Sequence, residues 1–145
     1  MDAPLPDRLD LYEACVQSPP EMELLLRAIH GGDPLVLGED FAGTGDLARY
    51  WVSRDPRRSA IIIDLDEAAL ARATGTARLE AVAGDVRQAR PGLSPVDCLH
   101  AGNFSIGYLH TRNALLDYLR LARSRLRQGG VFVCDTYGGE SAYTL

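Results

Sequence analysis

Short apolar runs alternate with amphipathic segments along the chain. Each run is rich in Val, Ile, Leu or Ala and ends in a polar residue or glycine, as is typical of buried strands. The pattern predicts five strands, at residues 34–38, 59–64, 78–84, 96–102 and 131–135. It predicts helices at residues 7–17, 18–30, 46–53, 66–74 and 111–128. Strands that alternate with helices indicate right-handed crossovers and a parallel sheet covered on both faces.

The last predicted helix, residues 111–128, has the clearest apolar face. This face is formed by Leu115, Leu119, Ala122 and Leu126. Gly129 and Gly130 are expected to end the helix, because glycine is a poor helix former and a common residue just past a helix. Trp51, on the helix that follows the first strand, is expected in the core.

Every predicted strand ends in a polar or glycine cluster. The clusters are Glu39-Asp40, Asp64, Gly84-Asp85, Gly102-Asn103 and Asp135. A lone acid after a strand is usually a helix cap. Because the carboxyl ends of parallel strands meet at one edge of the sheet, where ligands bind, five such clusters together predict a ligand site at that edge.

A glycine loop follows the first strand. Its sequence, "GTGDLA" at residues 43–48, fits the dinucleotide pattern G-x-G-x-x-G/A, in which glycines let the backbone approach a ligand. A tight strand–helix turn is the alternative interpretation. Asp64 ends the next strand nineteen residues after Gly45, where a carboxylate can accept hydrogen bonds from ribose hydroxyls. The two features predict an adenosine-containing ligand without choosing between NAD and S-adenosylmethionine.

Five segments, taken in order, resemble motifs of the class I S-adenosylmethionine-dependent methyltransferases. They are "VLGEDFAGTG", "IIIDLDEAALARA", "VAGDV", "VDCLHAGNFSIGYL" and "LRQGGVFVCDTY", within residues 34–137. The resemblance implies a Rossmann-like, doubly wound α/β fold of five mainly parallel strands in the order 3-2-1-4-5, with helices on both faces. The family's last two strands would be absent, so a C-terminal segment or a second copy in a homodimer would cover the edge of strand five.

The resemblance also implies S-adenosylmethionine as the cofactor. Asp64 would bind the ribose, Asp85 would face the adenine amino group, and Val86 would offer its backbone N–H. Glu39 would attract the ammonium end, directly or through water, unless it is a solvated loop acid. The implied cofactor residues are Tyr12, Glu39, Phe41, Ala42, Gly43, Thr44, Gly45, Asp64, Leu65, Asp85, Val86 and Asn103. Phe41 stands where the family usually has glycine, so the loop is expected to be wider there or Phe41 to pack against the cofactor.

The implied reaction is methyl transfer, by direct displacement, to an oxygen or nitrogen of a small-molecule acceptor. Tyr108 and His110 are the candidate catalytic residues, because they follow the fourth strand beside the expected methyl group. His110 could remove a proton from the acceptor, or it could merely precede the helix or pack. Tyr108 could line the acceptor pocket or pack in a core. Residues 1–33, with Tyr12, would form a helical lid or cap over the core of residues 34–145, and a helix that patches the sheet is the alternative.

Charge and composition narrow the function classes. The net charge is -5 and all fifteen basic residues are arginine, so no nucleic-acid partner is expected and catalysis by a lysine is excluded. The three cysteines show neither a disulfide framework nor metal-ligand spacing, and no metal is expected. No apolar run predicts a membrane span or a signal peptide, and a cytoplasmic protein is the resulting expectation.

Two other functions remain open from the sequence. An NAD(P)-binding oxidoreductase domain would share the glycine loop and the acid after strand two. Its short-chain branch would need a Tyr-x-x-x-Lys pair, which a chain without lysine cannot have. A five-strand remnant that binds the cofactor, or nothing, and acts as an interaction module is the second alternative.

Overall fold

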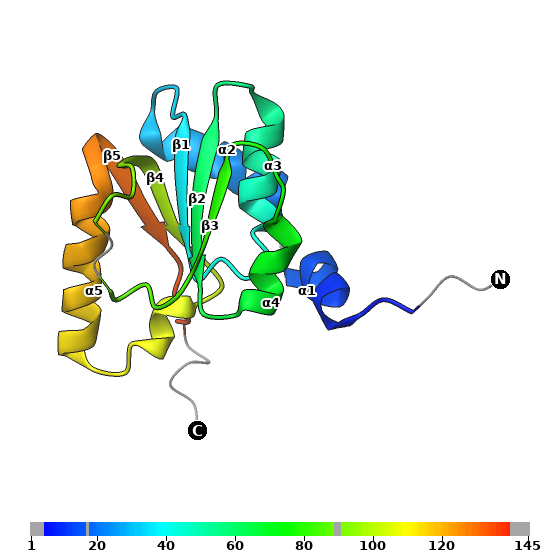
Figure 1. Cartoon of the computed structure of the whole chain (residues 1–145). Coiled ribbons are helices and arrows are strands. Elements are labelled where there is room, and N and C mark those ends of the chain that lie inside the picture. The colour runs from blue at the N-terminus through cyan, green and yellow to red at the C-terminus, as the bar shows by residue number, and fades with distance from the viewer. Residues whose placement is uncertain (1–4, 17, 89–90, 140–145) are drawn as a thin grey trace.

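A five-stranded sheet forms the centre of the computed structural model, which describes residues 5–16, 18–88 and 91–139 (Figure 1). The strands are β1 (Val36–Asp40), β2 (Ser59–Asp64), β3 (Leu79–Ala83), β4 (Val96–Ala101) and β5 (Leu126–Cys134). All four pairings are parallel, and the strand order is β3-β2-β1-β4-β5. The predicted α/β fold and strand order are therefore confirmed.

Helices cover both faces of the sheet. One face carries α2 (Pro19–His30), α3 (Asp46–Arg54) and α4 (Glu67–Leu70), and the other carries α5 (Arg112–Arg125). Two 3₁₀ turns, η1 (Ala71–Ala73) and η2 (Ser105–Tyr108), follow α4 and β4. The first helix, α1 (Arg8–Val16), lies near α4, beside the end of the sheet to which the strand arrowheads point (Figure 1). Gln17, the predicted last residue of this helix, lies outside the described residues.

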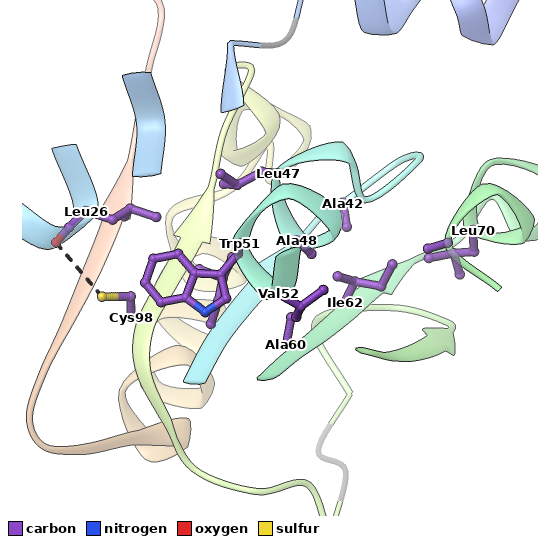
Figure 2. Packing of buried hydrophobic residues seen from close by; sticks show 12 residues of the cluster. Leu26, Ala42, Leu47, Ala48, Trp51, Val52, Ala60, Ile62, Leu70 and Cys98 are labelled. Atoms are coloured by element: carbon purple, nitrogen blue, oxygen red, sulfur yellow. Dashed lines mark hydrogen bonds between the residues drawn. The ribbon is translucent and has the colours of Figure 1, made fainter. Parts of the chain in front are cut away.

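Trp51 anchors the core on the α2–α3 face, as expected. Its side chain is wholly buried, and Figure 2 shows it directed toward Leu26 of α2 and Cys98 of β4. The indole N–H donates to the carbonyl oxygen of Leu35 over 3.3 Å. The guanidinium of Arg58 lies 4.3 Å from the ring centroid, which adds a cation–π contact to the apolar packing.

A buried polar cluster attaches α5 to β1 on the opposite face. Asp40 is wholly buried, and its carboxylate accepts hydrogen bonds from the Tyr118 hydroxyl over 2.9 Å and from Arg125 Nη1 over 2.6 Å. Burial raises the pKa of Asp40, and the charge of Arg125 opposes that shift. Tyr118 also packs edge-on against Phe41, with ring centroids 5.8 Å apart, so this cluster supports the loop that follows β1.

Several predicted boundaries are wrong, including both ends of the last strand and the end of the fourth helix, which is α-helical only over Glu67–Leu70. The first strand covers Val36–Asp40 rather than residues 34–38, because the parallel ladder continues to the pair Asp40–Ile63. The last helix ends at Arg125 rather than at residue 128, because Leu126 adopts an extended conformation and pairs with Val96. The glycine pair expected to end that helix lies instead inside β5. A Cβ at Gly130 would lie 3.0–3.2 Å from three backbone oxygens, so the close approach of β4 requires glycine there.

Candidate functional site

A cavity of about 460 Å³ opens at the carboxyl edge of the sheet, between α1, the loop after β1, the ends of β2 and β3, and η2. A volume of this size suits a ligand as large as a nucleoside derivative. Nine of the residues predicted from the sequence line it. They are Tyr12, Phe41, Gly43, Thr44, Asp64, Leu65, Asp85, Val86 and Tyr108.

The loop after β1 turns through left-handed backbone at three positions. Phe41, Gly43 and Gly45 have φ angles of 55°, 55° and 65°. Glycine adopts this conformation without strain, whereas the Cβ atom of phenylalanine makes it sterically unfavourable. The Gly45 N–H donates to the Ala42 carbonyl over 2.9 Å, which closes the turn before α3 begins. Phe41 therefore has the left-handed backbone conformation that is typical of glycine, and its side chain lines the cavity.

Asp64 organises the loop from the end of β2. One carboxylate oxygen accepts the Gly43 N–H over 2.7 Å, and the other accepts the Asp66 N–H over 2.8 Å. A carboxylate has about four lone-pair positions. Asp64, which is half-buried and lines the cavity, thus retains the capacity to accept ribose hydroxyls.

Thr44 offers an unused polar atom at the same cavity. Its side chain is wholly buried and lines the cavity, and its Oγ1 has no hydrogen-bond partner among the described residues. Buried polar atoms normally have partners, so this hydroxyl is suited to a ligand atom. An orphaned hydroxyl, the Asp64 carboxylate and a cavity of nucleoside size together fit an adenosyl group.

The loop after β3 forms the other end of the cavity. Asp85 accepts hydrogen bonds from the backbone N–H of Arg87 over 2.9 Å, from its Nε, shared between both carboxylate oxygens, over 3.0 Å, and from its Nη2 over 2.6 Å. Val86 is buried beside it. Ser105 and Leu109, from η2 and the residue after it, complete this end. This arrangement places an acid, whose two carboxylate oxygens accept hydrogen bonds from Arg87, beside a buried aliphatic side chain.

Three predicted cofactor residues, Glu39, Ala42 and Gly45, lie in the core below the cavity. Glu39 is 4% exposed, so the alternative of a solvated loop acid is wrong. Burial raises the pKa of Glu39 to about 8, a backbone hydrogen bond with Ala48 in the first turn of α3 opposes the shift, and the nearby acids Asp46, Asp40 and Asp64 add to it. Glu39 is therefore mostly protonated at neutral pH in the ligand-free protein. Its contact with an ammonium group stays a prediction.

Polar contacts attach α1 to the edge of the sheet. The helix has no buried residue among those described. Arg72 pairs with Asp10 over 2.7 Å and also with Asp7, at the start of the segment. The Tyr12 hydroxyl accepts a hydrogen bond from Asn103 Nδ2 over 2.9 Å. The segment with Tyr12 thus lines one side of the cavity, although none of its described residues is buried.

The remaining predicted residues, Asn103 and His110, lie at a second, smaller cavity and at the surface. Asn103 lines a cavity of about 300 Å³ together with His100 and Asp135. Tyr108 is 75% exposed, so the alternative that it packs in a core is wrong. His110 is exposed and lines neither cavity, and its role in proton removal stays a prediction.

Several cavity residues were missed in the sequence. Arg8 and Leu9 line the first cavity from α1, and Arg87 lines it through the loop after β3. Arg87 lies two residues after Asp85, and this short spacing was a usable signal for an ion pair. The α1 residues had no such signal, because their position depends on ion pairs with residues more than sixty positions away.

Two further features are absent from the described part of the chain. No group of three or more His, Cys, Asp and Glu residues there is arranged to hold a metal ion. No described helix combines the length and the apolar character that a membrane span requires.

Neither models of protein families nor curated protein sequences match the chain. Solved structures do match it. The sugar N-methyltransferase KedS8 from Streptoalloteichus sp. aligns with 99% of this chain and 59% of its own, at 21% identity and a TM-score of 0.76. CalS10, an amino pentose methyltransferase from Micromonospora echinaspora solved with S-adenosylmethionine, aligns with 97% of this chain and 61% of its own, at 21% identity and a TM-score of 0.75.

DesVI from Streptomyces venezuelae aligns with 87% of this chain and 52% of its own, at 20% identity and a TM-score of 0.73. The chain thus spans between about half and three fifths of the length of these three proteins. Identities near 20% establish a shared architecture. The chain has the Rossmann-like fold of the class I S-adenosylmethionine-dependent methyltransferases, over part of their length.

Proposed function

We propose that the first cavity binds S-adenosylmethionine and that the chain contributes to methyl transfer onto a small molecule. The observation that carries this proposal is the junction of β1 and β2. There the Asp64 carboxylate accepts the Gly43 N–H, and Thr44, whose buried hydroxyl has no partner among the described residues, lines the same cavity. The fold is that of methyltransferases that include a sugar N-methyltransferase and an amino pentose methyltransferase.

Different residues would bind different parts of the cofactor. Asp64 would accept the ribose hydroxyls, and Asp85 and Val86 would contact the adenine. Phe41 and Tyr12 line the cavity with aromatic rings, and such rings attract a sulfonium cation. The α1 segment would act as a lid, because none of its described residues is buried and the ion pairs that attach it can be broken and re-formed.

The cofactor, when bound, supplies a methyl group on a positively charged sulfur that an acceptor oxygen or nitrogen displaces directly. The chain's task is to orient the acceptor and exclude water. Tyr108 lines the exposed side of the cavity, where an acceptor would enter, and His110 follows it by two residues. For an acceptor that enters on this side, His110 would remove its proton and Tyr108 would form part of its binding surface.

Calorimetric titration with S-adenosylhomocysteine tests the cofactor proposal. The product should bind the wild-type chain, and Asp64→Asn should weaken it about 10- to 100-fold, because hydrogen bonds to a charged acceptor contribute about 1.5–3 kcal/mol. Asp117→Asn, at an exposed position on α5, is the matched control and should bind as the wild type does. Circular dichroism checks that each variant is folded.

Titration with NAD⁺ tests the alternative function, because an oxidoreductase domain would share the glycine loop and Asp64. Binding of NAD⁺ in place of S-adenosylhomocysteine would replace the methyltransferase proposal. Unchanged affinity of a folded Asp64→Asn variant would refute the assigned ribose contact. Binding of neither ligand would favour the alternative of a non-catalytic interaction module.

A further inference from the structure

We propose that the second cavity is the binding site of a small amine, whose nitrogen is the methyl acceptor. The inference rests on the proposed function and narrows its acceptor from an oxygen or nitrogen compound to an amine. It places that amine beside His100 in the second cavity rather than beside Tyr108 and His110. The cavity has a volume of about 300 Å³ and lies between α2, the start of α3, and the carboxyl ends of β4 and β5. Four features of this cavity carry the argument.

The first feature is its position beside the proposed cofactor site. Tyr12 lines the first cavity and Asn103 lines the second. Their side chains are hydrogen-bonded to each other over 2.9 Å, so this pair forms part of the wall between the two cavities. A molecule in the second cavity would therefore lie next to the cofactor, as an acceptor must.

The second feature is charge. Glu21 and Asp135 line the second cavity, and none of its described lining residues is an arginine. The first cavity, by contrast, has both Arg8 and Arg87 in its lining. The absence of arginine from the described lining of the second cavity is informative, because the chain has fifteen arginines. Two carboxylates without a neighbouring cation favour a positively charged or hydrogen-bond-donating ligand over an anionic one.

The third feature is a buried imidazole. His100 is 7% exposed and lines the cavity, and its Nδ1 has no hydrogen-bond partner among the described residues. Burial lowers the pKa of His100, and the charge of Asp135 only partly offsets this, so the ring is neutral at pH 7. A neutral imidazole can accept a hydrogen bond from an amine N–H. Glu39 on β1 pairs with His100 on β4 in the strand register. Because Glu39 is mostly protonated at pH 7, it carries little charge that would raise the pKa of the imidazole.

The glycine that follows β4 makes room for this ring. A Cβ at Gly102 would lie 2.5 Å from Cε1 of His100 and 2.8 Å from its Nε2. Any side chain at position 102 would thus displace the imidazole from the edge of the cavity. The glycine thus lets a buried imidazole without a hydrogen-bond partner among the described residues lie at the edge of the cavity. A buried group of this kind lowers the stability of the fold, so its presence favours a role in ligand binding.

The fourth feature is a partly apolar wall. Met22 and Leu25 of α2 and Leu47 of α3 also line the cavity. The volume is near the lower limit of small-molecule sites. The combination fits an amine on a compact, partly aliphatic body. An amine that binds as its ammonium first gives a proton to the neutral His100, which passes it to water. The freed nitrogen lone pair then forms the N–C bond, the C–S bond electrons stay on sulfur, and the methylated nitrogen carries the positive charge.

Matched probes test the site. Cyclohexylamine and cyclohexanol have the same body and differ in the group offered to His100 and the carboxylates. In NMR titrations of the wild-type chain saturated with S-adenosylhomocysteine, the amine should bind about ten-fold or more tightly than the alcohol, since charge-assisted hydrogen bonds are about that strong. Equal binding of the two probes would overturn the proposal.

Two α2 variants locate the binding. Leu25→Trp should fill the cavity and abolish amine binding, while its neighbour Leu24→Trp, outside this cavity, is the matched control and should not. Glu21→Gln, at an exposed position that does not threaten folding, should weaken amine binding, and the exposed Glu67→Gln should leave it unchanged. Amine binding that survives both Leu25→Trp and Glu21→Gln would overturn the proposal.

The cofactor's own ammonium group is the rival occupant, and the same variants distinguish it. If the second cavity holds the amine acceptor, Leu25→Trp leaves the affinity for S-adenosylhomocysteine unchanged. A parallel loss of affinity for S-adenosylhomocysteine and for cyclohexylamine would overturn the acceptor assignment. Failure of the wild-type chain to bind S-adenosylhomocysteine would instead refute the proposed function, and it is measured without the amine.

Discussion

The buried Glu39 gives a prediction that can be worked out from the structure. Its carboxyl group lies at the first turn of α3, next to Ala48, and its Oε2 has no hydrogen-bond partner among the described residues. Burial raises the pKa of Glu39 from 4.5 to about 8. Glu39→Gln replaces the acid with a neutral side chain of nearly the same shape, which keeps an oxygen to accept a hydrogen bond from the backbone N–H of Ala48.

The sign of the pH dependence follows from this raised pKa. Between pH 4.5 and about 8 the folded protein keeps a proton on Glu39 that the unfolded chain has lost. The stabilising contribution of Glu39 is therefore fully present below pH 4.5 and is lost as the pH rises through about 8. The loss amounts to about 1.4 kcal/mol per pH unit, or roughly 4 kcal/mol between pH 5 and pH 8. That is a large share of the usual stability of about 5–15 kcal/mol for a domain.

Urea unfolding of the ligand-free protein at pH 5, 6, 7 and 8 measures this effect. The free energy of unfolding of Glu39→Gln, relative to the wild type, should increase with pH by about 4 kcal/mol over this range. The exposed Glu67→Gln is the control, and its profile should run parallel to that of the wild type. Parallel profiles for Glu39→Gln and wild type would show that Glu39 titrates normally and would refute the reasoning.

Two further substitutions test the surroundings of the site. Asp40→Ala should destabilise the fold by about 3–5 kcal/mol in urea unfolding, because it leaves the charge of Arg125 without its buried partner; a loss as small as that of Asp117→Ala, in an exposed pair, would contradict this. Gly45→Ala adds a Cβ only 2.7 Å from Cδ1 of a buried β2 isoleucine, at a φ of 65°, and should cost more than the roughly 1–2 kcal/mol of the left-handed conformation alone. Gly75→Ala has a similar φ of 81° and free space, so equal losses for the two variants would contradict the predicted contact.

Periodicity was sufficient to predict the five strands and the edge of the sheet at which the cavity lies, whereas the strand order and most of the cavity residues were predicted from the resemblance to methyltransferases. The β-branched run "SAIIID" predicted β2 at its observed bounds, and the acids after the strands predicted the ligand edge. Asp64 and Asp85 line one cavity because parallel strands end at the same edge of a sheet, a rule that needs no knowledge of side-chain packing.

The buried acids could not be predicted in the same way. Charged residues are almost never fully buried without a partner, so the hydrophobic pattern predicted that the first strand ends before Glu39 and Asp40. The partner of Asp40 is Arg125, eighty-five positions away, and no local signal connects the two. His100 likewise looks like an isolated polar residue within an apolar strand, and only the fold places it beside Asp135 and the second cavity.

The end of α5 shows the same limit. Helix propensity and the glycine pair favoured a helix through residue 128, but pairing with β4 extends the strand back to Leu126. The Asp97 carboxylate also accepts a hydrogen bond from Arg127, which helps to hold this segment against β4. Tertiary contacts thus outweighed local propensity over three residues.

A structure of the protein with S-adenosylhomocysteine tests the central claim most directly. The account predicts density for the ribose within hydrogen-bonding distance of Asp64 and for the adenine between Asp85 and Val86. Ligand density elsewhere, or an adenosine that contacts neither Asp64 nor Val86, would contradict it.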